Sequence, residues 1–470
     1  MIKKIILSIL ISNLIANIIN VPDEFETIQG AINYSSNNDT ILINPGIYYE
    51  NLIIDDKHIT ILSSGNQGNT IIDGSNSLNP ILICNNILHE TLTIKGITIQ
   101  NGTGLNINGA TYGGGILSKN SNINIQESTI QNNSAFAGGG ICFYSTETSN
   151  TNPMISNTII YNNLASEGGG IFCVNHNLNI ENSDISANGM DLYGSGGGIQ
   201  ALLSNINIYN TTIKQNETKF GGGIYISNSN SNLENVRIEQ NYSDSKGGGI
   251  WVGGNTELTI IKTIISDNYS VGFGGGIFSS ISNLNFINTN IVENIVSGNI
   301  LGAGIYMDGG YSAINNSIIY FNYNEDNFNN PNYNLGGYSS NNFNEYNISY
   351  SNIQGNGDWI PSGLGIISED PLFIDLNNNN YYLSPDSPCI NSGDPSILDN
   401  DNTISDMGAY QYQGQITGDL NNDSSINIAD IVILVNLIIN NEYSIYGDLN
   451  EDEDNNIQDI VLLVNSILNN

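Results

Sequence analysis

A glycine cluster followed by isoleucine recurs eight times between residues 113 and 305 of this chain. Successive copies lie 25 to 30 residues apart, and alanine replaces the middle glycine in the last copy. The repeated isoleucines are Ile116, Ile141, Ile171, Ile199, Ile224, Ile250, Ile277 and Ile305. A period of this length is typical of a solenoid, in which each repeat forms one coil that stacks on the preceding coil.

A second phrase, Ile-x-x-Asn, has the same period. Its asparagines are Asn133, Asn163, Asn188, Asn216, Asn241, Asn268, Asn294 and Asn322. We expect them to lie above one another, where their amides can hydrogen-bond from coil to coil. Stretches such as 121–125 and 203–208 alternate apolar and polar residues, which predicts strands with one face inward. The sequence thus predicts an all-β fold, a parallel β-helix with two or three short strands per coil and Gly or Asn at the corners.

Residues 1–20 are predicted to be a secretory signal peptide, because Lys3 and Lys4 precede a short apolar stretch. Ala16 is a candidate for the cleavage site. No other segment reaches the ~20 apolar residues that a membrane-spanning helix needs. We therefore expect a secreted or cell-surface protein with no transmembrane segment after signal cleavage.

The formal net charge is -35 at pH 7, and the last basic residue is Lys262. Nucleic acids and anionic membranes are poor partners for such a chain, because phosphate binding requires Lys and Arg. An anionic polysaccharide would need a bridging cation. Among the four cysteines, Cys142 directly follows Ile141, whereas Cys173 lies two residues after Ile171. This offset of one residue predicts that Cys142 and Cys173 point to opposite faces of neighbouring coils. We therefore expect separate buried thiols and no disulfide between them.

The N-terminal part resembles the start of a known superfold. Residues 25–34 are predicted to form a short amphipathic helix that covers the open end of the solenoid. The stretch 39–51, with Asp39-Thr40-Ile41 and Asn44-Pro45-Gly46, resembles the opening of bacterial right-handed parallel β-helix proteins of the pectin-lyase-like superfold. This assigns 21–325 to the β-helix, with an N-terminal cap at 21–55 and the glycine repeats at 96–325.

Two further resemblances concern the rest of the spiral. The repeats resemble those of polymorphic outer-membrane proteins, which are surface adhesins. In residues 326–415, the phrases Asp370-Pro371-Leu372-Phe373 and Ser387-Pro388-Cys389 resemble the segment that ends many secreted bacterial β-helices. We interpret 326–415 as irregular terminal coils followed by this closing segment.

The last part, 416–470, contains two twelve-residue loops, 419–430 and 448–459, and each precedes an apolar helix expected at 431–438 and 460–468. Oxygen-bearing side chains at positions 1, 3, 5, 9 and 12 suit Ca²⁺. The pair resembles a type I dockerin, a small α-helical calcium-binding domain. The resemblance implies two Ca²⁺ ions. The first would be held by Asp419, Asn421, Asp423, Ser425, Asn427 and Asp430, and the second by Asp448, Asn450, Asp452, Asp454, Asn456 and Asp459, with Ser425 and Asp454 acting through their backbone carbonyls.

The chain departs from the dockerin pattern at two kinds of position. Position 6, usually glycine, is Ser424 and Glu453, which would weaken calcium affinity. The Ser/Thr pairs by which dockerins recognise cohesins are replaced by 428–429 (Ile-Ala) and 457–458 (Ile-Gln), which argues against a cohesin-like partner. The module would then dock on the spiral itself or on another surface protein.

Catalytic motifs of the superfold are not evident. The catalytic residue sets of polygalacturonases and pectin esterases are absent, and a lyase would need a basic residue beside calcium-binding carboxylates. The candidates for that base are Arg237, Lys214, Lys219 and Lys246, and Arg237 is expected at a solvated turn. We interpret His58, His89 and His176 as surface or turn residues. Carboxylates that could pair across coils are Glu167, Asp184, Asp191, Glu239 and Asp267.

Aromatic residues recur just before the glycine clusters, and they are Tyr112, Phe136, Tyr193, Phe220 and Phe273. They form either a column that grips sugar rings or a packing ladder. The sequence favours a non-catalytic surface or matrix protein that presents a long face to a carbohydrate or a cell-surface partner. The alternatives are a polysaccharide lyase or glycoside hydrolase of the same fold, and a structural spacer.

Overall fold

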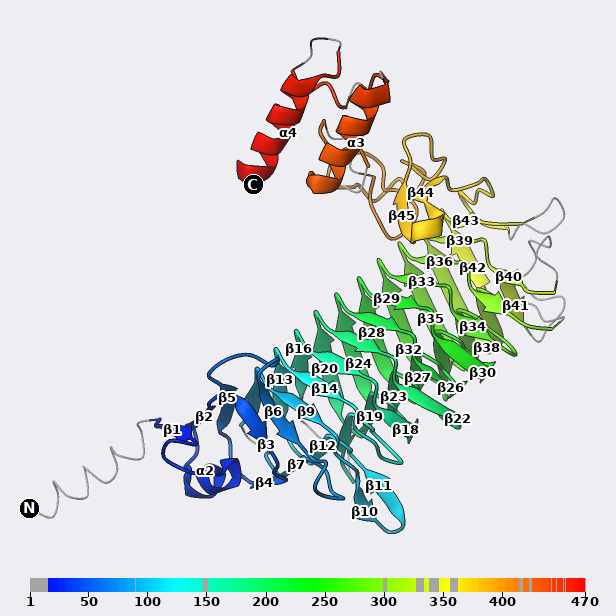
Figure 1. The fold of residues 1–470 in the computed structure, drawn as a ribbon. Helices are drawn as coiled ribbons and strands as arrows, with labels where there is room; N and C mark the ends of the chain where they lie inside the picture. Colours follow the sequence, from blue (N-terminus) through cyan, green and yellow to red (C-terminus); the bar gives the residue numbers. More distant parts are fainter. Residues whose placement is uncertain are drawn as a thin grey trace, which may run out of the picture.

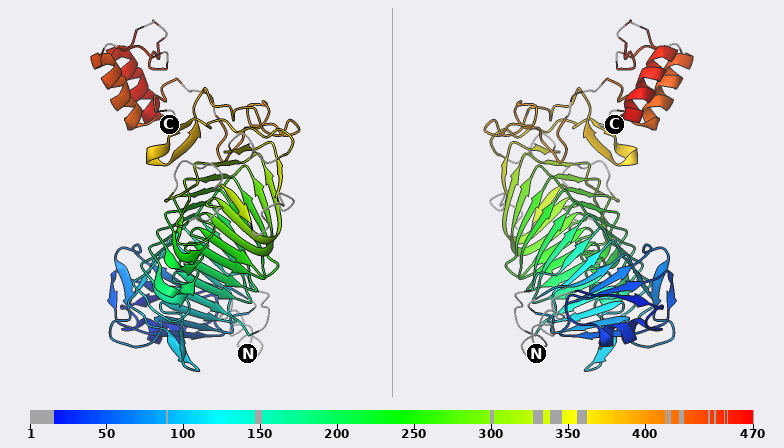
Figure 2. Two further views of the ribbon diagram at one scale, coloured as in Figure 1. Left: turned by 90° about the vertical axis from the view of Figure 1, so that its right-hand side faces the viewer. Right: turned by 90° about the vertical axis from the view of Figure 1, so that its left-hand side faces the viewer.

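A computed structural model of the chain describes residues 16–88, 90–146, 151–298, 302–326, 334–337, 346–355, 362–412, 414, 417–421, 425–440, 442–444, 446–450, 452 and 454–469. Its main part is a parallel β-solenoid whose coils stack from the N-terminal to the C-terminal end (Figure 1). Figure 2 shows the same stack from two opposite sides. Three parallel sheets, here named A, B and C, run along it.

Sheet A has 22 strands in two columns, which the long strands β35 and β38 join. The strands are β1 (Ile18–Val21), β2 (Thr40–Ile43), β4 (Leu52–Asp55), β5 (Thr60–Ser63), β7 (Leu82–Asn85), β8 (Leu92–Lys95), β12 (Ile116–Lys119), β13 (Ile123–Gln126), β15 (Ile141–Tyr144), β16 (Met154–Ser156), β19 (Ile171–Val174), β20 (Asn177–Glu181), β23 (Ile199–Leu202), β24 (Asn205–Tyr209), β27 (Ile224–Ser227), β28 (Asn230–Glu234), β31 (Ile250–Gly253), β32 (Glu257–Ile261), β35 (Ile277–Ile287), β38 (Ile305–Asn315), β41 (Leu335–Gly337) and β42 (Tyr346–Ser349).

Sheet B has 12 strands, one from each coil. They are β3 (Gly46–Tyr48), β6 (Thr70–Asp73), β9 (Thr98–Gln100), β14 (Thr129–Gln131), β17 (Ile159–Tyr161), β21 (Asp184–Ser186), β25 (Thr212–Lys214), β29 (Arg237–Glu239), β33 (Ile264–Ser266), β36 (Asn290–Val292), β39 (Ile318–Tyr320) and β43 (Asn352–Ile353).

Sheet C has seven short strands in the middle coils. They are β18 (Leu164–Glu167), β22 (Gly189–Ser195), β26 (Glu217–Phe220), β30 (Tyr242–Lys246), β34 (Tyr269–Ser270), β37 (Ile295–Val296) and β40 (Tyr323–Asn324). Two antiparallel hairpins leave the spiral: β10 (Leu105–Ile107) with β11 (Ala110–Tyr112), and β44 (Phe373–Asp375) with β45 (Asn380–Leu383), which a short 3-10 helix, η3 (Leu376–Asn378), connects.

Both repeated phrases occupy the positions that the sequence predicts. The glycine-cluster isoleucines pair in register from Ile116 to Ile305 and are completely buried in the central core. In the asparagine column, the Asn216 amide donates to the Ile185 carbonyl at 2.9 Å and to the Asn241 side chain at 3.0 Å. The same contacts recur along the ladder, so each asparagine satisfies polar groups of the corner.

The glycine clusters allow neighbouring coils to approach closely. In the cluster 138–140, Gly138 has a φ of 66°, in the left-handed region that favours glycine. A Cβ atom on Gly139 or Gly140 would lie 2.6 Å from the carbonyl oxygen of Gly169 or Gly170 in the next coil. Each cluster therefore leads the chain around a corner into the next strand of sheet A.

The N-terminal helix α2 (Ile28–Tyr34) begins three residues later than predicted. The Thr27 hydroxyl accepts a hydrogen bond from the Gly30 amide at 3.1 Å and so caps the helix, which leaves Phe25 outside it. Residues 1–15 of the predicted signal peptide lie outside the described residues. Residues 18–20, which the sequence assigned to the signal peptide, belong to β1, and Ile19 is buried there. A mature chain that begins after Ala16 would keep this strand.

The closing segment packs on the side of the spiral. Tyr381, Leu383, Cys389 and Met407 form a second core against the outer face of the last strands of sheet B. This arrangement differs from a simple end cap, because apolar side chains such as Ile318 point outward in this part of sheet B and require cover.

Helices α3 (Ile428–Asn440) and α4 (Ile457–Asn469) lie beyond the closing segment and pack against each other (Figure 1). Both begin three residues earlier than predicted, because Asn427 and Asn456 accept hydrogen bonds at 2.8 Å from the amides two residues later and cap the helices. Within the described part of the chain, no helix is both long and apolar enough to cross a bilayer.

The cysteines lie as the sequence predicts. Cys142 pairs in register with Phe172, whereas Cys173 pairs with Phe143, so the two thiols point to opposite faces of sheet A. All four cysteines are free and buried. Burial raises the pKa of each thiol, which makes them unreactive packing residues.

Candidate functional site

The second strand column of sheet A presents a regular outer face of asparagine side chains. Asn207 donates to Asn179 at 3.0 Å, and Asn232 donates to Asn207 at 2.9 Å. The same column continues in register with Thr259 and Asn285. Because polar groups repeat along this face from coil to coil, it can offer the same contacts to several units of a polymer.

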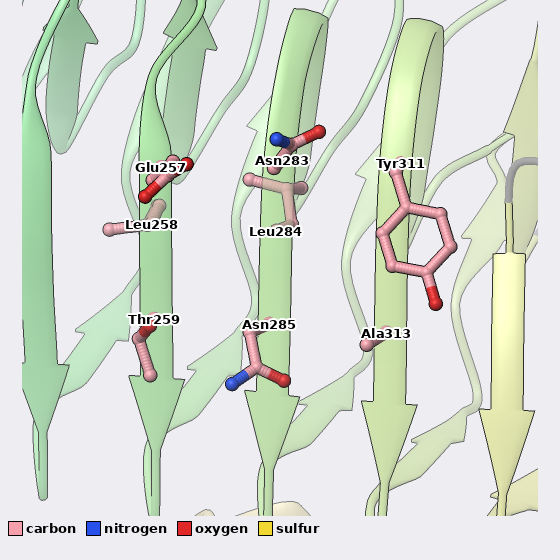
Figure 3. Close-up of a pocket in the computed structure, with 8 residues that line it drawn as sticks. All are labelled: Glu257, Leu258, Thr259, Asn283, Leu284, Asn285, Tyr311 and Ala313. Atoms are coloured by element: carbon pink, nitrogen blue, oxygen red, sulfur yellow. The ribbon is translucent and has the colours of Figure 1, made fainter.

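A groove of about 450 Å³ lies on this face, where it crosses β32, β35 and β38. Figure 3 shows its outward side chains in two rows, and the lining also includes Leu258 and Leu284. One row contains Glu257, Asn283 and Tyr311, and the other contains Thr259, Asn285 and Ala313. Tyr311 is 43% exposed. The groove combines one aromatic ring with amide, hydroxyl and carboxylate groups.

The predicted aromatic column does not form. Sheet C register places Tyr112, Phe220 and Phe273 in one column, but Ala137, Glu167, Ser195 and Lys246 interrupt it. Phe136 precedes Ala137 and Tyr193 lies in a bulged part of β22, so both fall out of that column.

A different aromatic ladder lies on the outer side of the first strand column of sheet A. The residue after the glycine-cluster isoleucine is aromatic in four consecutive repeats, and these residues are Tyr225, Trp251, Phe278 and Tyr306. The Tyr225 and Trp251 rings are parallel, with centroids 4.1 Å apart. Because the faces of these rings stack on one another, few ring faces are left for stacking against a sugar. We therefore interpret this ladder as a packing feature. The repeated aromatic position was visible in the sequence.

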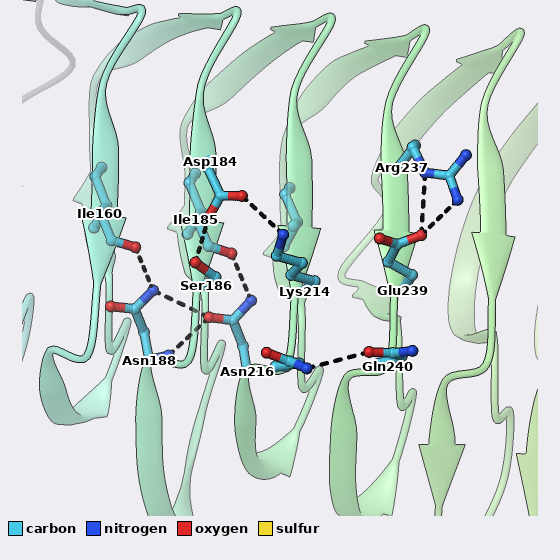
Figure 4. A network of polar contacts seen from close by, with 12 residues as sticks. Ile160, Asp184, Ile185, Ser186, Asn188, Lys214, Asn216, Arg237, Glu239 and Gln240 are labelled. Carbon is cyan, nitrogen blue, oxygen red and sulfur yellow. Dashed lines mark hydrogen bonds and ion pairs between the residues drawn. The ribbon is translucent and has the colours of Figure 1, made fainter. Parts of the chain in front are cut away.

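The candidate bases for a lyase lie apart from one another. Arg237 is in β29 instead of a solvated turn, and Nη2 contacts the Glu239 carboxylate at 2.8 Å (Figure 4). Lys214 pairs with Asp184 at 3.2 Å. Lys219 and Lys246 lie over the rings of Phe220 and Phe278, at 5.4 and 4.5 Å. Each cation is engaged locally, so the four do not converge on a reaction centre.

A carboxylate pair lies under the closing segment. Asp267 and Glu293 each directly precede a ladder asparagine in consecutive coils. The Tyr381 hydroxyl donates to Glu293 at 3.2 Å, and Tyr381 is only 1% exposed. Burial and then Asp267 raise the pKa of Glu293 to about 7, and burial and then Glu239 raise the pKa of Asp267. The sequence identified Asp267 but missed Glu293, although both occupy the position before a ladder asparagine.

The raised pKa of Glu293 predicts a pH-dependent stability. The folded protein holds this proton more tightly than the unfolded chain, so its contribution is complete below about pH 4.5 and is lost as the pH rises toward 7. Between pH 5 and 8 we expect a loss on the order of 1 kcal/mol, discounted because the carboxyl group is partly solvated. Denaturant unfolding at both pH values should show a smaller loss for Glu293→Gln, whereas exposed Glu257→Gln should behave as wild type. Equal pH dependence of wild type and Glu293→Gln would contradict this assignment.

The two histidines in the described part of the chain, His58 and His176, lie in different coils and do not form a site. His176 is buried instead of exposed, and its Nδ1 lies 2.9 Å from the Thr151 hydroxyl. Burial lowers the pKa of His176, which keeps the ring neutral. His58 lies near the N-terminal helix, where its backbone amide bonds to Asn37, and His89 lies outside the described residues.

The second C-terminal loop has the internal hydrogen bonds of a closed oxygen-rich loop. Asp459, at position 12, accepts from the amides of Leu449 at 2.9 Å and Asn456 at 2.9 Å. Asp448, at position 1, accepts from the Asp452 amide at 3.0 Å, and Asp452 accepts from the Asp454 amide at 3.1 Å. The position 1 and position 12 side chains therefore each bond to backbone amides of this loop.

The first loop repeats part of this arrangement. Asp430 accepts from the amides of Leu420 and Asn427, both at 2.8 Å. Asn421 and Ser425 lie in the same loop, and the Ser425 carbonyl accepts from Asn427. Asp423 lies outside the described residues. The carboxylates at positions 1 and 12 of both loops are buried, although no Lys or Arg follows Lys262.

These oxygen donors suit a hard cation, which would compensate the buried negative charge. Asn450 and Asn456 lie among the acidic residues of the second loop. Within the described part of the chain, however, no three His, Cys, Asp or Glu side chains form a group that could hold a metal ion. A cation would therefore depend on the amide and carbonyl oxygens as well.

The three parallel sheets and the repeated corners define a parallel β-solenoid. Residues 175–319 match the family model described as right handed beta helix region. No curated protein matches the sequence.

Several solved structures are similar in fold. Pectate lyase Pel9A is 12% identical, with 84% of this chain and 96% of that chain covered and a TM-score of 0.36. Pectin methylesterase PemA from Erwinia chrysanthemi is 10% identical, with 57% and 89% covered and a TM-score of 0.30. The receptor-binding domain of the Siphovirus 9NA tailspike is 10% identical, with 73% and 78% covered and a TM-score of 0.25. At these identities and TM-scores the likenesses say nothing about the activity of this protein.

Proposed function

We propose that this protein is an exported, non-catalytic surface or matrix protein that binds carbohydrate along the outer face of sheet A. The observation that carries the proposal is the outward polar column of that face, which runs through consecutive coils as Asn179, Asn207, Asn232, Thr259 and Asn285. Amide groups donate and accept hydrogen bonds, as sugar hydroxyl groups require. A repeated ligand such as a polysaccharide can therefore meet equivalent groups in each coil.

The C-terminal module is proposed to bind two Ca²⁺ ions and to attach the spiral to another surface protein. Equivalent apolar side chains of the two helices are exposed, with Ile428 at 71% and Ile457 at 74%, and Val432 and Val461 both at 55%. Calcium would fix the two loops and hence the relative position of these side chains. Dockerins recognise cohesins through Ser/Thr pairs, and Ile428 and Ile457 stand at the first position of these pairs. Because the exposed side chains here are apolar, they support a partner other than a cohesin.

A polysaccharide lyase or glycoside hydrolase is the second candidate, and the pair Asp267 and Glu293 is the observation that favours it. Equivalent residues of adjacent coils are about 4.8 Å apart, near the ~5 Å separation of carboxyl groups in retaining glycoside hydrolases. However, the buried Tyr381 bonds to Glu293 and covers this pair. A substrate could reach the carboxylates only after the closing segment moved, which is why binding is the preferred function.

A glycan array with parallel assays for unsaturated products and reducing ends distinguishes the proposals. We expect binding to at least one polysaccharide and no turnover of pectin, alginate or xylan, with or without Ca²⁺. Product formation that disappears in Arg237→Ala or Glu293→Gln would instead establish an enzyme. If the protein neither binds nor degrades any glycan, the spacer function is favoured.

A further inference from the structure

We infer that the groove around Tyr311 is the principal sugar-binding site, and that it takes a short segment of an uncharged polysaccharide lying along the axis of the spiral. This inference rests on the proposed carbohydrate binding and names its location and ligand class. The lining residues come from three adjacent strands, β32, β35 and β38. Three strands span about 10 Å, enough for roughly two sugar rings in line.

Tyr311 differs from the aromatic ladder in the access to its ring. Its register neighbour on β35 is Asn283, whereas Trp251, Phe278 and Tyr306 each stand beside another aromatic ring. In the next row, Ala313 is small and leaves space beside the ring (Figure 3). The exposed ring can therefore stack against the apolar face of a pyranose.

The polar side chains of the groove are available to a ligand. In the preceding coils, Asn179, Asn207 and Asn232 bond to one another through their side chains. Among the described residues, the side chains of Asn283 and Asn285 have no hydrogen-bond partner. The side-chain ladder thus ends where the groove begins, and these two amides remain free for sugar hydroxyls.

Charge selects the class of sugar. Among the described residues that line the groove, Glu257 is the one that carries a charge, and the whole chain has a formal charge of -35. A carboxylate accepts hydrogen bonds from hydroxyl groups but repels a uronate. Neutral oligosaccharides should therefore bind better than galacturonate oligomers of the same length.

Isothermal titration of the full chain with cellohexaose, xylohexaose and hexagalacturonate tests the inference. We expect Tyr311→Ala to weaken binding of the neutral ligand at least about tenfold, and Tyr311→Phe to retain it, because stacking needs only the ring. The control Tyr161→Ala removes a tyrosine that is 45% exposed on sheet B and should bind as wild type.

The outcomes separate the two proposals. If the wild type binds a neutral glycan and Tyr311→Ala binds it equally well, the groove is not the site, but the proposed function stands. Tighter binding of hexagalacturonate overturns the ligand class. If the wild type binds none of these ligands or any array glycan, the proposed function itself fails. A thermal unfolding scan of each variant shows whether a loss of binding reflects a loss of folding.

Discussion

The variant Ile224→Asp should lose about 4 kcal/mol or more of the free energy of unfolding of the spiral. Ile224 is completely buried between Ile199 and Ile250 in the inward column. The aspartate would lose the packing of the isoleucine side chain and place a carboxylate among apolar groups. Urea unfolding followed by far-ultraviolet circular dichroism measures the effect.

A matched surface variant separates burial from charge. Asn230→Asp adds the same carboxylate one strand later, on the exposed outer face of sheet A, and should change stability by less than about 0.5 kcal/mol. If Ile224→Asp were as stable as Asn230→Asp, the inward column would be assigned incorrectly. A variant that fails to fold at all would agree with the expectation, provided that Asn230→Asp folds.

Removal of Ca²⁺ should unfold or loosen the C-terminal module while the spiral remains folded. Without the cation, the buried carboxylates at positions 1 and 12 of each loop repel one another, because this part of the chain has no Lys or Arg. Titration of the chelated full chain should reveal two bound ions and a gain of helical signal. The expected increase in the module's stability is about 3 kcal/mol for each bound ion when the free ion exceeds the dissociation constant a hundredfold.

The double variant Asp419→Ala, Asp448→Ala should abolish both binding events, since each change removes the position 1 carboxylate. Glu442→Ala, an exposed acidic residue between the loops, is the control for charge alone and should retain two ions. Equal helical signal in excess chelator and in excess Ca²⁺ would contradict the calcium assignment. Hydrogen exchange of α3 and α4 would locate any change in the module.

The architecture of the spiral was predictable because its residues repeat. A buried isoleucine column and an asparagine ladder each need one residue type at one place in every coil, so the period alone reveals them. The helix boundaries were less predictable. Thr27, Asn427 and Asn456 cap helices through single hydrogen bonds, and the sequence does not show which of several polar residues makes such a bond.

The site was harder to predict because it depends on neighbours that the period does not specify. Tyr311 is one aromatic residue among many, and its exposure follows from Asn283 and Ala313 in adjacent rows. Tyr381 reaches Glu293 across 88 positions of sequence. A local pattern contains no information about that contact, which explains why the carboxylate pair and its cover appeared only in the structure.

The asparagine ladder has a consequence for the length of the molecule. Asn216 and Asn241 each make the same bonds to the preceding and following coils, so every coil offers its successor an equivalent surface. The 25 residues from one rung to the next are therefore an interchangeable unit. Duplication or loss of such a unit in the gene would change the reach of the protein by about 4.8 Å and preserve every type of contact. Smaller changes in length fall between the strands of a coil, as the spacing of 25 to 30 residues between glycine clusters shows, so the stack itself grows or shrinks by whole coils.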